Sequence, residues 1–240
     1  RMPTVLASSS AYGYPAINLI DPATWSSWKP AEINKQARYD FGSPIGIDAI
    51  GIAAHTFTPG SGQFSLHHSN DAITWTEIQT ITVPSKDDIL VLFPYINTRY
   101  VRVACVNETP NIGVLIVGSR LIFPHTPVDS YTPLHHSRKY TKQFNDSVKG
   151  AMLGSRVMAA GAETAVDLGF VERQFADITM KPFSDHYNQG GTFFFAGWPA
   201  GQPHDMGYCR ASDEEGIVSI EYVEAGKLAN VSLGVRSYVG

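Results

Sequence analysis

The chain has 240 residues, of which 43% are hydrophobic, 11% aromatic and only 17% charged, and its formal net charge is −4. This composition excludes an intrinsically disordered chain, which would have fewer aromatic residues and more charge. The small negative charge supplies no basic surface for nucleic acid and no polybasic patch for an anionic membrane, so we expect neither partner. No stretch approaches the roughly 20 apolar residues of a membrane span, so we expect no membrane insertion.

Short apolar or alternating runs fill the first half of the chain, and glycines, prolines and other turn formers separate them. In residues 63–68, Phe64 and Leu66 alternate with polar residues, which is the pattern of a half-buried strand. Many short strands between turn signals predict an antiparallel sandwich or barrel, so the fold class is mainly β.

A linker is predicted at residues 126–137, inside a segment (124–137) with three prolines and several turn formers. Proline removes a backbone donor and restricts the residue before it, so regular structure tends to stop there. The linker divides the chain into a domain at 1–125 and a second domain at 138–240.

The second domain is also predicted to be β-rich, with one short helix. Between residues 170 and 187 the apolar positions Val171, Phe175, Ile178 and Met180 approach helical spacing, and Pro182 is expected to end or kink this helix. Cys105 and Cys209 lie in separate strand-like runs and are expected to be buried free thiols.

Three successive phenylalanines, Phe193 to Phe195, follow two glycines. Consecutive residues of a strand point to opposite faces, so we expect both faces to be covered, by a second layer of the domain or by another subunit. This segment is the strongest indication of an assembly role in the sequence.

Four segments of the first half carry a family resemblance. Residues 16–28 read AINLIDPATWSSW and residues 37–57 read ARYDFGSPIGIDAIGIAAHTF. Residues 62–78 read GQFSLHHSNDAITWTEI and residues 97–105 read NTRYVRVAC. In this order they resemble the discoidin, or coagulation factor type C, family over about half of the chain. The resemblance implies a galactose-binding-like jelly-roll β-sandwich over residues 1–125 that acts as a non-catalytic binding or assembly module.

One position departs from the family pattern. Ala72 stands where the family usually has glycine, in the turn that contains Ser69, Asp71 and Trp75. Asp71 or Ala72 is therefore expected in a different turn type. Trp75, just beyond this turn, is expected to anchor the sandwich core.

The resemblance also indicates a metal site. In discoidin relatives the loop that matches Asp21, Thr24 and Trp25 can help hold a calcium ion, so Asp21 is a candidate calcium ligand with Asn18 beside it. The alternative is that Asp21 caps a turn with Pro22 and that Trp25 packs in the core. No other cofactor is expected.

A glycan-binding loop is a second hypothesis for the same region. The rings of Tyr12, Tyr14 and Trp28 are candidates for stacking on a pyranose, with Asn18 as a hydrogen-bonding partner. The alternative is that this loop packs on a neighbouring subunit or on its own sandwich. The sequence contains no nucleophile elbow, phosphate loop, Rossmann glycine pattern or zinc-ligand spacing, so we expect no enzyme activity.

The second half carries a fainter resemblance. Residues 190–211, GGTFFFAGWPAGQPHDMGYCRA, look like a segment of tail-tip and baseplate proteins of tailed bacteriophages. It implies a virion structural protein, made in the host cytoplasm, that assembles with copies of itself and other tail proteins and contacts host glycans. The alternatives are a secreted or cell-surface carbohydrate-binding module or adhesin, and a binding domain cut from a larger glycoside hydrolase.

Overall fold

The fold is described from a computed structural model, and the described residues are 3–125, 127, 131–212 and 216–239. Two compact units divide between Arg120 and Leu121. Both are mainly β and antiparallel, which confirms the predicted fold class. None of the helices in the described part of the chain is long and apolar enough to cross a membrane.

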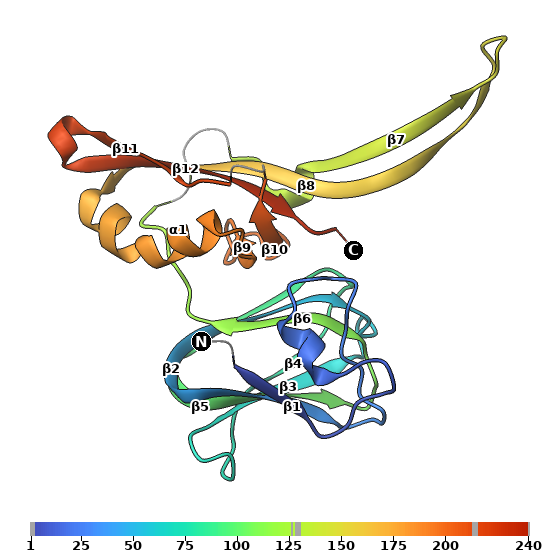
Figure 1. The fold of residues 1–240 in the computed structure, drawn as a ribbon, viewed down its shortest axis with the longest axis vertical. Coiled ribbons are helices and arrows are strands. Elements are labelled where there is room, and N and C mark those ends of the chain that lie inside the picture. The colour runs from blue at the N-terminus through green and yellow to red at the C-terminus, as the bar shows by residue number, and fades with distance from the viewer. Residues whose placement is uncertain (1–2, 126, 128–130, 213–215, 240) are drawn as a thin grey trace. The chain divides into compact units, whose positions relative to one another are not determined.

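The first unit is a β-sandwich with one 3-10 helix, η1 (Ala16–Ile20), ahead of its second strand (Figure 1). The described strands are β1 (Thr4–Ala7), β2 (Gln36–His55), β3 (Gln63–Ser69), β4 (Thr76–Thr82), β5 (Ile89–Val106) and β6 (Ile112–Gly118). They pair in the order β1-β2-β5-β3-β4, and β6 pairs with β2.

Two long strands, β2 and β5, build both layers of the sandwich. The register of their pairing shifts between Asp40 and Ile45. Before the shift β2 pairs with β1 and the later half of β5, and after it β2 pairs with β6 and the earlier half of β5. A strand that bends in this way turns its apolar side toward one shared core. Phe64 and Leu66 lie fully buried there, so the alternation predicted for residues 63–68 is confirmed.

The turn between β3 and β4 is held by Asp71. Its Oδ1 accepts hydrogen bonds from the backbone N–H groups of Ile73 and Thr74, both at 2.8 Å, and these bonds and one from Ser69 lower the pKa of Asp71 to about 2. Ala72 has φ +61°, in the left-handed region that favours glycine. Ala72 therefore occupies a glycine-type position.

The second unit is a six-stranded sheet in the described chain, with helices on one face. Its strands are β7 (Arg138–Asp146), β8 (Met152–Glu172), β9 (Phe193–Ala196), β10 (Met206–Ala211), β11 (Ser219–Val223) and β12 (Leu228–Ser237). Its helical turns are η2 (Leu134–His136), η3 (Phe175–Thr179, a π-helix), α1 (Lys181–Asn188) and η4 (Glu224–Gly226). The strand order is β7-β8-β12-β10-β9, and β11 pairs with β12.

The helical prediction is confirmed for Phe175 and Ile178, which lie in η3, but Val171 lies in β8. As predicted, this helix ends before Pro182, because η3 stops at Thr179. The sequence did not predict the second helix, which contains Pro182. That residue lies in the first turn of α1 and begins the helix. The first turn lacks partners for its N–H groups, so a residue without an N–H costs nothing there, and the fixed φ of proline suits it. Met180 and Tyr187 pack from this region into the core beneath the sheet.

The predicted linker needs correction. Leu121, Phe123, Tyr131 and Leu134 all pack in the core of the second unit. Tyr131 Oη donates to Asp205 Oδ2 at 2.6 Å, and Leu134 N–H donates to Asp205 Oδ1 at 2.7 Å. Much of the proline-rich segment is therefore part of the second unit, because its apolar side chains pack in the core of that unit. Residues 126 and 128–130 lie outside the described residues.

Two predictions about buried side chains are confirmed. Phe193 and Phe195 are buried on one face of β9, and Phe194 on the other face is half-buried beside its cross-strand partner Tyr208, with ring centroids 5.4 Å apart. Cys105 and Cys209 are buried, and neither forms a disulfide within the described residues. Burial raises the pKa of Cys105 to about 12, which keeps it as a thiol at neutral pH.

The hairpin of β7 and β8 extends beyond the rest of its sheet as a two-stranded ribbon (Figure 1). Every residue of β7 is exposed. An isolated two-stranded ribbon is marginally stable in water, so this hairpin is an unusual feature for a folded unit.

Replacing Ala72 with glycine should stabilise the first unit by up to about 1 kcal/mol. The left-handed conformation costs a non-glycine residue about 1–2 kcal/mol, and the greater unfolded-state entropy of glycine offsets part of the gain. Urea unfolding of the full chain, followed by circular dichroism, measures the change. Ala31→Gly is the control, because Ala31 has no positive φ and should gain nothing. A lower midpoint for Ala72→Gly than for the parent chain would contradict the assignment.

Candidate functional site

The loop between β1 and β2 is fixed to the sandwich by Trp28. The backbone N–H and C=O of Trp28 both pair with Ile112 at 2.9 Å, in an isolated β-bridge to β6. The indole N–H lies 3.2 Å from the carbonyl oxygen of Ser9 and 3.1 Å from Oγ of Ser10. The backbone and the ring nitrogen of Trp28 therefore both fix the loop to its surroundings.

Asn18 and Asp21 close turns within this loop. Asn18 Nδ2 donates to the carbonyl oxygen of Ser27 at 2.8 Å. Asp21 Oδ1 accepts from the backbone N–H of Ala23 at 2.9 Å, and its Oδ2 accepts from Ser26 Oγ at 3.3 Å. No group of three or more His, Cys, Asp or Glu side chains that could hold a metal occurs among the described residues. Calcium at Asp21 stays a prediction.

The aromatic rings of the loop divide into one buried and three exposed. Trp28 is 0% exposed, so its ring cannot stack on a sugar and the sequence-based assignment is wrong for this residue. Trp25, three residues earlier, is 87% exposed, so the alternative that placed Trp25 in the core is also wrong. Tyr12 is 103% exposed and Tyr14 is 40% exposed. The loop thus presents Tyr12, Tyr14 and Trp25 to solvent.

A second polar surface lies on the outward face of β2, β5, β3 and β4. Arg38, Arg102, His67 and Glu77 are cross-strand partners in one row of this sheet. The guanidinium of Arg102 lies 4.5 Å from the ring centroid of Trp75. Alternation in residues 101–103 places Arg102 opposite the buried Val101 and Val103, so the outward position of Arg102 was predictable from the sequence.

Trp75 corrects a further expectation. It is half-buried under Arg102, and its indole N–H donates to the carbonyl oxygen of Ala72 at 3.2 Å, so it does not anchor the sandwich core. The guanidinium replaces the apolar cover that a core tryptophan would have, because a cation is attracted to the face of an indole.

The charges on this face are unevenly satisfied. Arg99 makes two hydrogen bonds to Asp40, at 2.8 and 3.1 Å, which lower the pKa of Asp40. Arg102 Nε and His67 Nδ1 are buried and have no hydrogen-bond partner within the described residues. Burial, and secondly the charge of Arg102, lower the pKa of His67, so its ring is neutral at pH 7.

These surfaces suit binding to a polar ligand. An exposed ring can cover the C–H face of a ligand while amide, hydroxyl and guanidinium groups pair with its polar atoms. Asn18, Asp21 and the Arg99–Asp40 pair are already engaged in turns or an ion pair.

Residues 4–117 match the sequence profile of the family described as the F5/8 type C domain. This segment is an F5/8 type C, or discoidin, domain. The match confirms the family resemblance and the predicted sandwich of the first unit.

Solved structures similar to this chain include three carbohydrate-binding modules, each with a TM-score of 0.43. A pectin-binding module is 17% identical and covers 52% of this chain and 95% of its own. Chitosan-binding module 1 of a chitosanase/glucanase from Paenibacillus sp. IK-5 is 22% identical and covers 48% and 93%. A Clostridium perfringens module in complex with GalNAc-β-1,3-galactose is 15% identical and covers 48% and 94%. No curated protein matches the chain.

Replacing Trp28 with alanine should lower the free energy of unfolding of the F5/8 type C domain by about 3–5 kcal/mol, the usual cost of removing a large buried aromatic ring. Trp25→Ala is the matched control and should change it by less than about 0.5 kcal/mol, because that ring is exposed. Urea unfolding of both variants of the full chain measures the difference. Equal effects of the two substitutions would contradict the burial assigned to Trp28.

The pKa of His67 should rise when Arg102 is replaced by glutamine, because a nearby cation is removed. A folded-state pKa below the unfolded value of about 6.5 means that the contribution of neutral His67 to stability is complete above that pH and is lost as the pH falls through the folded-state pKa. An NMR titration of the His67 ring measures the shift, with Lys86→Gln as a control. An unchanged His67 pKa in Arg102→Gln would refute the coupling.

Proposed function

We propose that the F5/8 type C domain is a non-catalytic carbohydrate-binding module that holds its ligand on the loop between β1 and β2. The observation that carries the proposal is the exposure of Tyr12 and Trp25 on a loop that buried Trp28 fixes in place. Exposed aromatic rings on a fixed scaffold lose little conformational entropy when a ligand covers them.

Polar groups for the sugar hydroxyls lie on the same loop. The backbone of Lys29 pairs with Ala11 and with Tyr14, so Lys29 lies beside the segment that carries the tyrosines, and its ammonium group is a candidate donor. Asn18 and Asp21 act mainly by shaping the turns that carry these rings. Binding of this kind needs no reacting group, so the proposed function is recognition and not catalysis.

A second candidate is a structural component of a phage tail tip or baseplate, located in the virion, that contacts other tail proteins and host glycans. The exposed β7–β8 hairpin favours a role in assembly, because a ribbon without a core of its own is stabilised by a partner. The similar structures described above are carbohydrate-binding modules, so recognition of sugar is our first proposal and the virion location our second.

The test of the first proposal is calorimetric titration of the full chain with pectin fragments, chitosan oligosaccharides and GalNAc-β-1,3-galactose. We expect one of these glycans to bind weakly and the affinity to fall about tenfold, equivalent to about 1.4 kcal/mol, in Trp25→Ala and in Tyr12→Ala.

Repeating the titration with EDTA tests calcium at Asp21, since a resident ion would make binding sensitive to the chelator.

Trp198→Ala is the matched control, because Trp198 is also exposed but belongs to the second unit. It should bind like the parent chain. Undiminished binding by Trp25→Ala and Tyr12→Ala would place the sugar elsewhere. Absence of binding across these glycans and a wider glycan panel would refute the proposed function.

A further inference from the structure

One face of the β7–β8 hairpin, called here its apolar face, carries Tyr140, Phe144, Met152 and Val157 together with the polar Lys142, Ser155 and Asp146, and the other face is mainly polar. The cross-strand pairs Tyr140↔Ala160, Lys142↔Val157, Phe144↔Ser155 and Asp146↔Met152 point to one side, because paired residues share a face and successive residues alternate. The other side carries Lys139, Thr141, Gln143, Asn145 and Arg156. This is the alternation of a sheet that covers a core.

The apolar face continues the core-facing side of the second unit. Ala162 of β8 is buried in the core, and Ala160, two residues earlier, lies on the same side of the strand. From Ala160 toward the tip of the hairpin, no second layer in the described part of the unit covers this face. Among the described residues of 138–160, none belongs to a buried core cluster, and Phe144 and Met152 are 70% and 91% exposed. A sheet with one apolar face needs a second layer, and the hairpin lacks one within its own unit.

Charge indicates what the missing layer is. Residues 138–160 contain five Lys or Arg and one Asp, a net charge of +4 in a chain whose total is −4. Residues 161–240 contain five Lys or Arg and eleven Asp or Glu, a net charge of −6. Two hairpins would repel each other, whereas a hairpin and the body of another copy attract.

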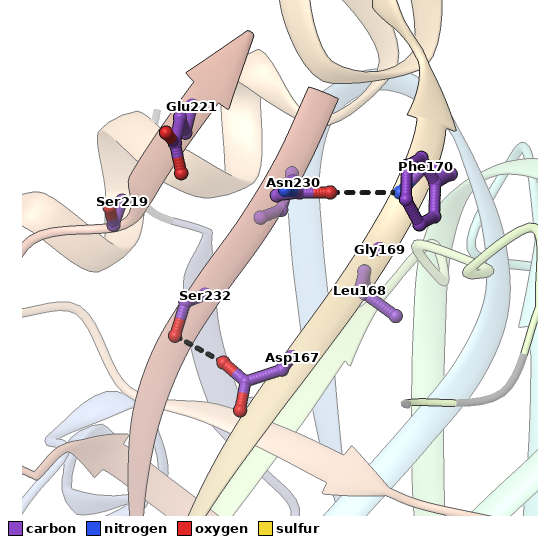
Figure 2. A pocket seen from close by; sticks show the side chains of 9 residues that line it. Asp167, Leu168, Gly169, Phe170, Ser219, Glu221, Asn230 and Ser232 are labelled. Atoms are coloured by element: carbon purple, nitrogen blue, oxygen red, sulfur yellow. Dashed lines mark hydrogen bonds between the residues drawn. The ribbon is translucent and has the colours of Figure 1, made fainter. Parts of the chain in front are cut away.

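The body of the second unit offers a matching groove of about 360 Å³ on its outward sheet face. Figure 2 shows Asp167 of β8, with its hydrogen bond from Ser232 of β12, and Glu221 of β11 on the same face. Phe170, which is 64% exposed, adds an apolar wall, and its backbone N–H donates to Asn230 Oδ1 at 3.1 Å. The groove is thus both acidic and apolar, which complements a basic and apolar hairpin.

The hairpin cannot reach the groove of its own chain. Both belong to β8, and Met152 and Asp167 are fifteen residues apart on that one strand, which separates them by about 50 Å at roughly 3.3 Å per residue. A second copy can supply the hairpin without any such constraint.

We propose that the apolar face of the β7–β8 hairpin docks into the Asp167–Glu221 groove of a second copy of this chain. The two surfaces differ, so the contact is head-to-tail and repeats from copy to copy into a ring or a filament. The inference rests neither on sugar binding nor on a virion location.

The test is a charge exchange, measured by sedimentation velocity of the full chain. The hairpin variant is Lys142→Glu with Lys149→Glu, and the groove variant is Asp167→Lys with Glu221→Lys. The parent chain should associate at micromolar concentrations, and more weakly in high salt. Each variant alone should associate at least tenfold more weakly, and an equimolar mixture of the two should regain an association that neither shows alone.

A control variant and a second test variant accompany the charge exchange. Lys35→Glu with Lys86→Glu makes the same charge change in the first unit and should associate like the parent chain. Phe144→Ser removes an exposed ring and should weaken association while the far-ultraviolet circular dichroism stays unchanged. A parent chain that remains monomeric at about 1 mM, far above the micromolar association expected, would overturn the proposal. So would parental association by either charge variant, or a mixture that fails to recover.

Discussion

The buried indole of Trp28 is the contact on which the candidate binding loop depends. Its backbone adds a bridge to β6, and its ring nitrogen reaches the segment that follows β1, so one residue joins both ends of the loop to the sandwich. A loop fixed at this point can leave Tyr12 and Trp25 in water without collapsing over them. The burial of one ring thus makes the exposure of the others possible, which links the packing of the core to the surface available for a ligand.

Much of the first unit was predictable because its strands alternate. Phe64 and Leu66 face the core as their spacing predicts, and the ordered family segments identified the sandwich. The candidate site was harder to predict. Trp25 and Trp28 lie in an irregular loop with no period to say which side each faces. The sequence therefore suggested Trp28 as an exposed ring and left core packing of Trp25 open, and the structure shows the reverse. The outcome depends on the distant strand β6, to which Trp28 of this loop makes an isolated bridge.

The second unit shows two other limits of sequence-based prediction. Pro182 follows the end of η3 and lies in the first turn of α1, two positions that suit proline equally well, so the sequence did not show that a second helix begins there. The β7–β8 hairpin alternates like a strand over a core, and this pattern does not say whether the core belongs to the same molecule. Only the exposure of its apolar face reveals that the covering layer comes from elsewhere.

The two units suit a division of labour between recognition and assembly. A shallow loop with a few exposed rings buries little of a sugar, so a single site of this kind binds weakly. Copies joined through their hairpins would present many such loops at a high effective concentration, and contact with a surface that carries many sugars would then be strong. The attraction between the basic hairpin of one copy and the acidic body of the next would hold these copies together.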